Sequence, residues 1–153
     1  MDIRERIITG AGKLFYSKGI KRVTMDDIST EIGMSKRTIY ENFRDKTEIL
    51  RATVDFLSDK HRQEVDQMQS ESGNVMEVII KILRYGLESI DLVSPMYLED
   101  MQKFFPRIWE ETIQKGGNLL RNNYRIYWNE EKKRGFSGLK LIPDWLPVFF
   151  MSN

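Results

Sequence analysis

The chain has 153 residues, a formal net charge of +1, 41% hydrophobic residues and no cysteine. So small a net charge excludes a polycation that holds nucleic acid by bulk charge, and the lack of cysteine excludes disulfides, thiolate metal sites and thiol redox switches. No apolar run approaches the roughly 18 residues of a membrane span, and the N-terminus has no apolar signal core, so we expect a cytoplasmic protein without a membrane partner.

The first predicted element is an amphipathic helix that ends at Gly19. Glycine directly after the last apolar position of a helical pattern is a common C-terminal signal. The apolar side chains recur at helical spacing and form one stripe that we expect to be buried. That stripe comprises Ile3, Ile7, Ala11, Leu14 and Phe15.

Two short helices are predicted next, joined at Gly33. Thr24 and Ser35 are residues that cap helix N-termini, so they fix where each of the two helices begins. Gly33 and the small Ser29 suit a tight turn between helices. Ile39 and Phe43, four residues apart in the second helix, can pack against Ile28 and Ile32 of the first. This layout is typical of a helix-turn-helix, which places its second helix in a DNA groove.

Charge placement distinguishes these helices from an ordinary helical pair. A helix N-terminus carries partial positive charge, so a basic residue there costs ~0.3–1 kcal/mol. The second helix nevertheless begins with Lys36 and Arg37, and the helix after Asp45 begins with Lys46. A bound phosphate would relieve this repulsion. A solvated helix face explains each basic residue singly, but it does not explain the set in this order and spacing.

Four sequence segments carry a family resemblance: LFYSKG at 14–19, VTMDDI at 23–28, GMSKRTIYENF at 33–43 and DKTEIL at 45–50. In this order they resemble the N-terminal DNA-binding domain of TetR-type transcriptional regulators. The resemblance covers residues 3–50 and implies a recognition helix at Ser35–Tyr40. Arg37 is the strongest candidate for a base contact, because a guanidinium can bond guanine O6 and N7 together.

The resemblance also assigns roles around the recognition helix. Lys36, Arg37 and Thr38 would lie near base edges, and Tyr40 would pack against the sugar-phosphate backbone. Thr24 and Lys46 would contact phosphates on either side. The predicted DNA-binding residues are therefore Thr24, Ser35, Lys36, Arg37, Thr38, Tyr40 and Lys46.

The remaining pattern is helical almost throughout. A long helix is predicted from Asp45 towards Met68, a loop at 70–74, an apolar helix at 75–92, a short helix from Ser94-Pro95 and a last long helix from Pro106. We therefore predict an all-α fold, with a three-helix helix-turn-helix DNA-binding domain at 1–46. An α-helical ligand-binding and dimerisation domain would follow at 47–153.

Residues 75–128 are rich in Met, Tyr, Phe and Trp, which in this family's regulatory domain often line a ligand cavity. Plain core is the commoner role for any one of them, but large adaptable side chains near Gly116-Gly117 suit an apolar pocket. We predict a small apolar ligand lined by Tyr85, Met101, Phe104, Phe105, Trp109 and Tyr124. His61, the single histidine, is expected at the surface, and no pattern indicates a metal, a cofactor or an enzyme site.

TetR-type regulators are usually longer, and their last two helices form the dimer interface. Here the sequence ends at Asn153, soon after the apolar segment Trp145–Met151 begins what resembles the first of those helices. A shortened C-terminal domain is therefore expected, and we predict that the apolar segment packs on a second copy or folds back over residues 75–128.

Two hypotheses of function follow. The first is a homodimeric repressor that a small apolar ligand releases from a palindromic operator in double-stranded DNA. The second is a helical interaction module that keeps the fold but binds another protein. The cations at Lys36, Arg37 and Lys46 favour the first, because a protein-binding module does not need them at helix N-termini.

Overall fold

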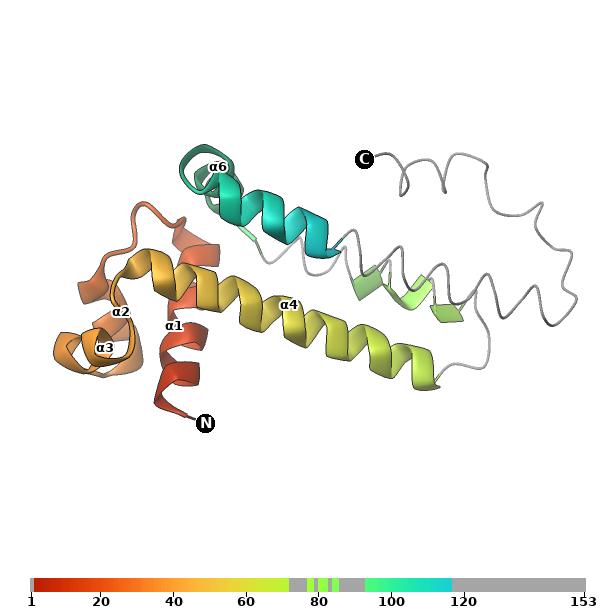
Figure 1. Cartoon of the computed structure of the whole chain (residues 1–153), viewed down its shortest axis with the longest axis horizontal. Coiled ribbons are helices and arrows are strands. Elements are labelled where there is room, and N and C mark those ends of the chain that lie inside the picture. Colours follow the sequence, from red (N-terminus) through yellow and green to blue (C-terminus); the bar gives the residue numbers. More distant parts are fainter. Residues whose placement is uncertain (1, 72–76, 79, 83, 86–92, 117–153) are drawn as a thin grey trace, which may run out of the picture. The chain divides into compact units, whose positions relative to one another are not determined.

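The structure is a computed structural model that describes residues 2–71, 77–78, 80–82, 84–85 and 93–116 (Figure 1). Within these ranges every regular element is a helix, which confirms the predicted all-α fold. The helices are α1 (Ile3–Lys18), α2 (Met25–Ile32), α3 (Lys36–Asn42), α4 (Lys46–Glu71) and α6 (Pro95–Phe104). Residues 106–116 and the described residues between 77 and 85 are helical too.

The chain divides into two compact units, residues 1–110 and residues 111–153. Of the second unit, the structure describes residues 111–116 alone. The predicted apolar segment Trp145–Met151 lies outside the described residues. The predicted domain boundary between residues 46 and 47 stays a prediction.

Helix α1 begins and ends at residues that satisfy its free backbone groups. The Asp2 side chain accepts a hydrogen bond from the Ile3 N–H, and Gly19 ends the helix with a φ of 82°. Glycine adopts that positive φ without the strain that a side chain would cause. The predicted apolar stripe is buried except at Ile3, whose side chain is 46% exposed. Burial of Ile3 was wrongly predicted, because the residue stands in the first turn, before the stripe enters the core at Ile7.

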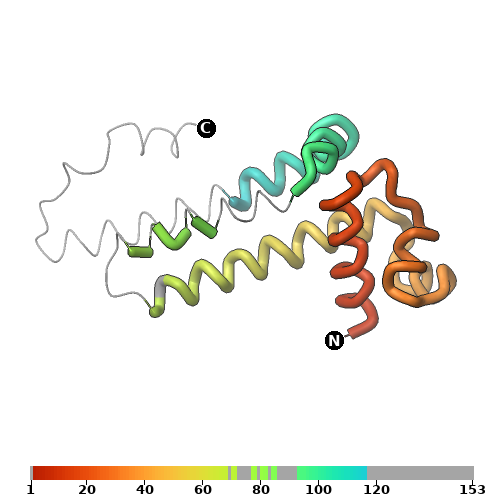
Figure 2. Tube along the Cα trace, turned by 180° about the vertical axis from the view of Figure 1, so that it is seen from behind, coloured from red at the N-terminus to blue at the C-terminus, as the bar shows by residue number. Residues whose placement is uncertain are grey.

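The core of the first unit lies where α1, α2 and α3 gather around the first turns of α4 (Figure 2). Helix α1 packs against both α2 and α4, while α3 packs against α2. Most of the largest fully buried side chains come from these four helices and from the loop between α1 and α2, and Met101 of α6 joins them. They include Ile7, Phe15, Ile20, Val23, Ile28, Ile39, Phe43, Ile49 and Leu50.

Helix α1 approaches α2 closely at Gly10. A Cβ atom added there would lie 2.2 Å from Cγ2 of Ile32. Gly10→Ala should therefore destabilise the fold by about 1–3 kcal/mol, since overpacking forces neighbouring side chains to shift, even though alanine favours the helix by about 1 kcal/mol. Urea denaturation of both proteins would measure the difference in the free energy of unfolding.

Gly116 provides the matched control, because it too is helical and no atom of the described residues lies within 4 Å of a Cβ added there. Gly116→Ala should be neutral or stabilising by up to about 1 kcal/mol. Equal effects of the two substitutions would contradict the close approach of α1 to α2.

Helix α6 is held against the end of α1. Helix α6 begins where the sequence predicted a short helix: Ser94 caps it with its side chain, and Pro95 lies in its first turn. The Ser94 N–H donates to the Tyr16 carbonyl at 2.9 Å, and the Lys21 N–H donates to Asp100 Oδ2 at 2.8 Å. The Tyr16 and Tyr97 rings meet edge to face, with centroids 4.7 Å apart. Burial raises the pKa of the Tyr97 phenol, so this aromatic contact stays uncharged at physiological pH.

His61 lies in α4 and is half-buried, which corrects its expected surface position. Its ring packs against Tyr85, with centroids 4.8 Å apart. Burial lowers the pKa of His61 below its ordinary 6.5, because the charged imidazolium is poorly solvated beside the second ring.

This lowered pKa of His61 predicts a pH-dependent stability. Between the pKa of the folded state and 6.5 the unfolded chain binds more protons, so the free energy of unfolding should fall as the pH drops through 6.5. His61→Phe keeps a ring against Tyr85 but cannot titrate. Denaturant midpoints at pH 7.5 and 5.5 should differ less in this variant than in the wild type. The same pH dependence in both proteins would contradict the assignment to His61.

Candidate DNA-binding interface

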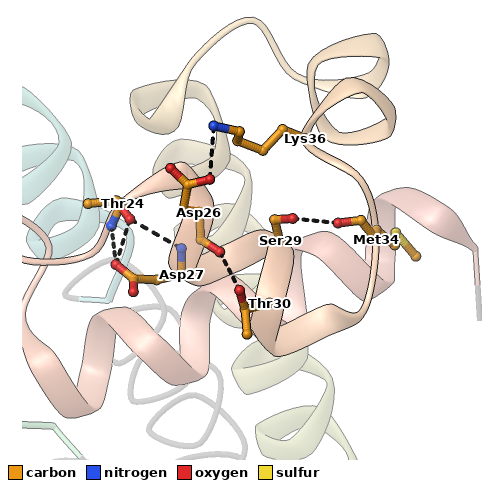
Figure 3. A network of polar contacts seen from close by, with 7 residues as sticks. All are labelled: Thr24, Asp26, Asp27, Ser29, Thr30, Met34 and Lys36. Carbon is orange, nitrogen blue, oxygen red and sulfur yellow. Dashed lines mark hydrogen bonds and ion pairs between the residues drawn. The ribbon is translucent and has the colours of Figure 1, made fainter.

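The start of α2 is fixed by a reciprocal pair of side chains, Thr24 and Asp27 (Figure 3). The Asp27 N–H donates to Thr24 Oγ1 at 3.1 Å, and the Thr24 N–H donates to Asp27 Oδ2 at 2.8 Å. These two bonds satisfy backbone donors that a helix N-terminus leaves free. Hydrogen bonds from the Thr24 side chain and backbone lower the pKa of Asp27, so the carboxylate is charged at neutral pH.

The turn between α2 and α3 is closed by Ser29 and Gly33. Gly33 has a φ of 63° in the left-handed region, and its N–H donates to the carbonyls of Ser29 and Thr30. The Ser29 hydroxyl donates to the Met34 carbonyl at 2.6 Å (Figure 3). The Met34 N–H returns a bond of 3.1 Å to the Ser29 carbonyl. Gly33 and Ser29 thus form the tight turn that the sequence predicted.

Helix α3 is capped at one end and anchored in the core at the other. Ser35 Oγ accepts from the Thr38 N–H at 3.1 Å, and the two hydroxyls lie 3.0 Å apart. Ile39 and Phe43 are buried, with 0% and 1% of their surfaces exposed. Because residues four apart share a helix face, this anchoring directs another face outward. That exposed face carries Lys36, Arg37, Tyr40 and Glu41.

Both cations at the start of α3 have carboxylate partners within the chain. Lys36 Nζ lies 2.8 Å from Asp26 Oδ1 in α2, and Arg37 Nε lies 3.0 Å from Glu41 Oε1 one turn along α3. The hydrogen bond to Asp26 raises the pKa of Lys36. These partners were not predicted from the sequence, although the spacing of Arg37 and Glu41 by four residues was a signal for the second pair.

Lys46 is placed differently from the other predicted contacts. Its ammonium donates to the carbonyls of Ile20 at 2.9 Å and Val23 at 2.7 Å, in the loop before α2. Burial lowers the pKa of Lys46, which marks a partly desolvated ammonium. These bonds explain a cation at the start of α4 without a phosphate, and the predicted phosphate contact of Lys46 stays a prediction.

Two arginines of α1, which were not among the predicted site residues, bind the C-terminal ends of α2 and α3. Arg4 donates from Nη1 to the Asn42 carbonyl at the end of α3, and its guanidinium stacks 4.1 Å from the centre of the Phe43 ring. Arg6 Nη2 donates to the Ile32 carbonyl at 3.2 Å, at the end of α2. Cations beside helix C-termini offset the negative end of the macrodipole. Arg4 and Arg6 are therefore positioning residues for α3 and α2, respectively.

The residues predicted to line a ligand pocket lie in different surroundings. Met101 is buried in the core that includes α1, and Phe105 and Trp109 pack against that core. Phe104 is 44% exposed, and the ammonium of Lys21 lies 4.6 Å from its ring centre. The Tyr85 ring packs on the His61 ring, whereas Tyr124 lies outside the described residues. A lining role for this set stays a prediction.

Comparison with known proteins gives this helix-turn-helix a family. Residues 7–53 match the sequence profile of the bacterial regulatory proteins of the tetR family. The chain belongs to the TetR family. In this TetR-family chain the matched residues cover most of α1, all of α2 and α3 and the first turns of α4, which are the elements that build the candidate interface.

Two curated relatives extend the similarity beyond the helix-turn-helix. The uncharacterised HTH-type transcriptional regulator YvaF of Bacillus subtilis (strain 168) is 28% identical over 106 residues, which cover 69% of this chain and 55% of YvaF. An HTH-type transcriptional regulator of Staphylococcus aureus (strain USA300) is 30% identical over 132 residues, which cover 83% of this chain and 62% of that protein. The TetR-family chain thus spans about half to three fifths of these two relatives.

A solved structure has a fold similar to that of this chain. The fatty acid degradation regulator FadR from Bacillus halodurans superposes with a TM-score of 0.67, covering 91% of this chain and 72% of that one at 17% identity. At that identity the likeness concerns the fold. Among the described residues, no helix of the TetR-family chain is long and apolar enough to cross a membrane.

Proposed function

We propose that this chain binds an operator in double-stranded DNA through α3 and regulates transcription as a repressor. In this proposal a homodimer places two α3 helices on a palindromic operator, and a small apolar ligand in the domain after α3 releases it. The protein acts in the cytoplasm and has no catalytic role. The predicted contacts to DNA are those of Thr24, Ser35, Lys36, Arg37, Thr38, Tyr40 and Lys46.

One observation carries this proposal: α3 is anchored by a buried face and presents an exposed basic face at its first turn. The side chain of Arg37 is 89% exposed and that of Lys36 is 51% exposed, so both can reach a ligand outside the protein. The family match over residues 7–53 supports DNA as that ligand. Phosphate contacts would orient the helix, while base edges in the major groove would give sequence preference.

Selection of bound duplexes from a random pool by the full chain tests the proposal. We expect enrichment of a palindromic motif and a steep loss of affinity with added salt, because counterions are released when cations neutralise phosphates. Recovery of no enriched motif at moderate salt would contradict operator binding.

The ion pairs on α3 favour a second candidate function, a module that binds another protein. Asp26 and Glu41 already neutralise Lys36 and Arg37, so these cations do not require a phosphate. A chain of this kind would bind DNA weakly and without sequence preference, so the same selection separates the two functions.

A further inference from the structure

The exposed face of α3 carries an acid beside its principal base-contact candidate. Arg37 Nε donates to Glu41 Oε1 at 3.0 Å, and the side chains are 89% and 58% exposed. Glu41 therefore lies on the face that the proposed function turns towards DNA, where a carboxylate is repelled by phosphates. Because Glu41 lowers the affinity for DNA at this position, we expect its carboxylate to have a second effect that compensates for this loss.

The geometry of the guanidinium supplies that role. An arginine has five N–H donors in a planar fork, and two neighbouring donors bind guanine O6 and N7 together. Because Glu41 occupies the Nε–H, the edge formed by the two terminal nitrogens, Nη1 and Nη2, is the one left for a base. The ion pair thus selects one of the two edges that Arg37 could present to a base.

We propose that Glu41 is a specificity-determining positioning residue that directs the terminal edge of Arg37 to a guanine. This inference rests on the proposed DNA-binding function. An exposed pair of this spacing favours its bonded geometry by a factor of about two in water. Exclusion of water from a protein–DNA interface lowers the local dielectric and strengthens the pair at the moment of contact. Glu41 gives up affinity for DNA in general and increases the preference of Arg37 for guanine.

Asp59 on α4 offers a matched control for the loss of one acid. Its carboxylate pairs with Arg62 at 2.8 Å, and both side chains are exposed, at 62% and 60%. Asp59→Ala therefore removes the same charge from another exposed Arg–carboxylate pair, away from α3.

The experiment compares base preferences of the wild-type chain, Arg37→Ala, Glu41→Ala, the double variant that combines these two substitutions, and Asp59→Ala at every position of the selected motif. Glu41→Ala should reduce the preference for guanine by about 3- to 10-fold at the same base pair where Arg37→Ala abolishes it. It should also raise affinity for unrelated DNA, and the double variant should lose no more preference than Arg37→Ala alone. Asp59→Ala should keep the wild-type preferences.

Other results would overturn the inference. A changed preference at a different base pair would make Glu41 an independent base contact, and an unchanged profile would leave it without a role in specificity. Loss of preference in Asp59→Ala as well would assign the effect to net charge. Failure of the wild type to enrich any motif would overturn the proposed function, and this inference with it.

Discussion

Arg37→Ala should weaken binding to the selected duplex by about 5- to 150-fold, the range expected for the loss of ~1–3 kcal/mol from a bidentate guanine contact. The side chain is 89% exposed, so the substitution should leave the free energy of unfolding within about 0.5 kcal/mol of the wild type. Fluorescence anisotropy with a labelled duplex at fixed salt would measure the dissociation constants.

Arg62→Ala is the control for loss of a positive charge, because Arg62 is an exposed cation on α4 rather than on α3. It should change affinity much less than Arg37→Ala. Equal weakening by both variants, or an equal loss of affinity for the selected and unrelated duplexes in Arg37→Ala, would contradict a base contact by Arg37.

Phe43→Ala should destabilise the protein by about 3–5 kcal/mol, the range for removing a large aromatic side chain from a packed core. Phe43 is 1% exposed, ends α3 and supports the Arg4 guanidinium on its ring. Phe43→Ala should therefore lower the denaturant midpoint and weaken DNA binding, since the end of α3 would no longer be anchored in the core. Guanidinium denaturation followed by circular dichroism would measure it.

Tyr40→Ala gives the comparison within the same helix. Tyr40 is 52% exposed, so its removal should change the free energy of unfolding by no more than about 0.5 kcal/mol. Similar losses of stability from Phe43→Ala and Tyr40→Ala would contradict the anchoring of α3 by one buried face.

The features predicted best from the sequence are those that depend on neighbouring residues. Caps such as Thr24, Ser35 and Ser94 bond to backbone groups three residues ahead. Gly19 and Gly33 adopt positive φ angles directly after the last residues of α1 and α2. Such interactions are encoded in short segments of sequence. The four helices that carry the candidate interface were predicted for this reason.

The features that were missed depend on residues far apart in the sequence. Arg4 bonds to the carbonyl of Asn42, 38 residues away, and Lys46 reaches back 26 residues to that of Ile20. No local pattern marks such contacts, so the cation at Lys46 was explained by a phosphate. Likewise the exposure of Phe104 follows from how α6 packs against α1, which helical periodicity does not determine.

An NMR titration of the ¹⁵N-labelled full chain with its selected duplex tests whether α3 is the DNA-contacting helix. We expect the largest changes in amide chemical shift on residues 35–41 and small changes on the amides of α6. The largest changes on α6, or no change on residues 35–41 at saturating duplex, would contradict this role of α3.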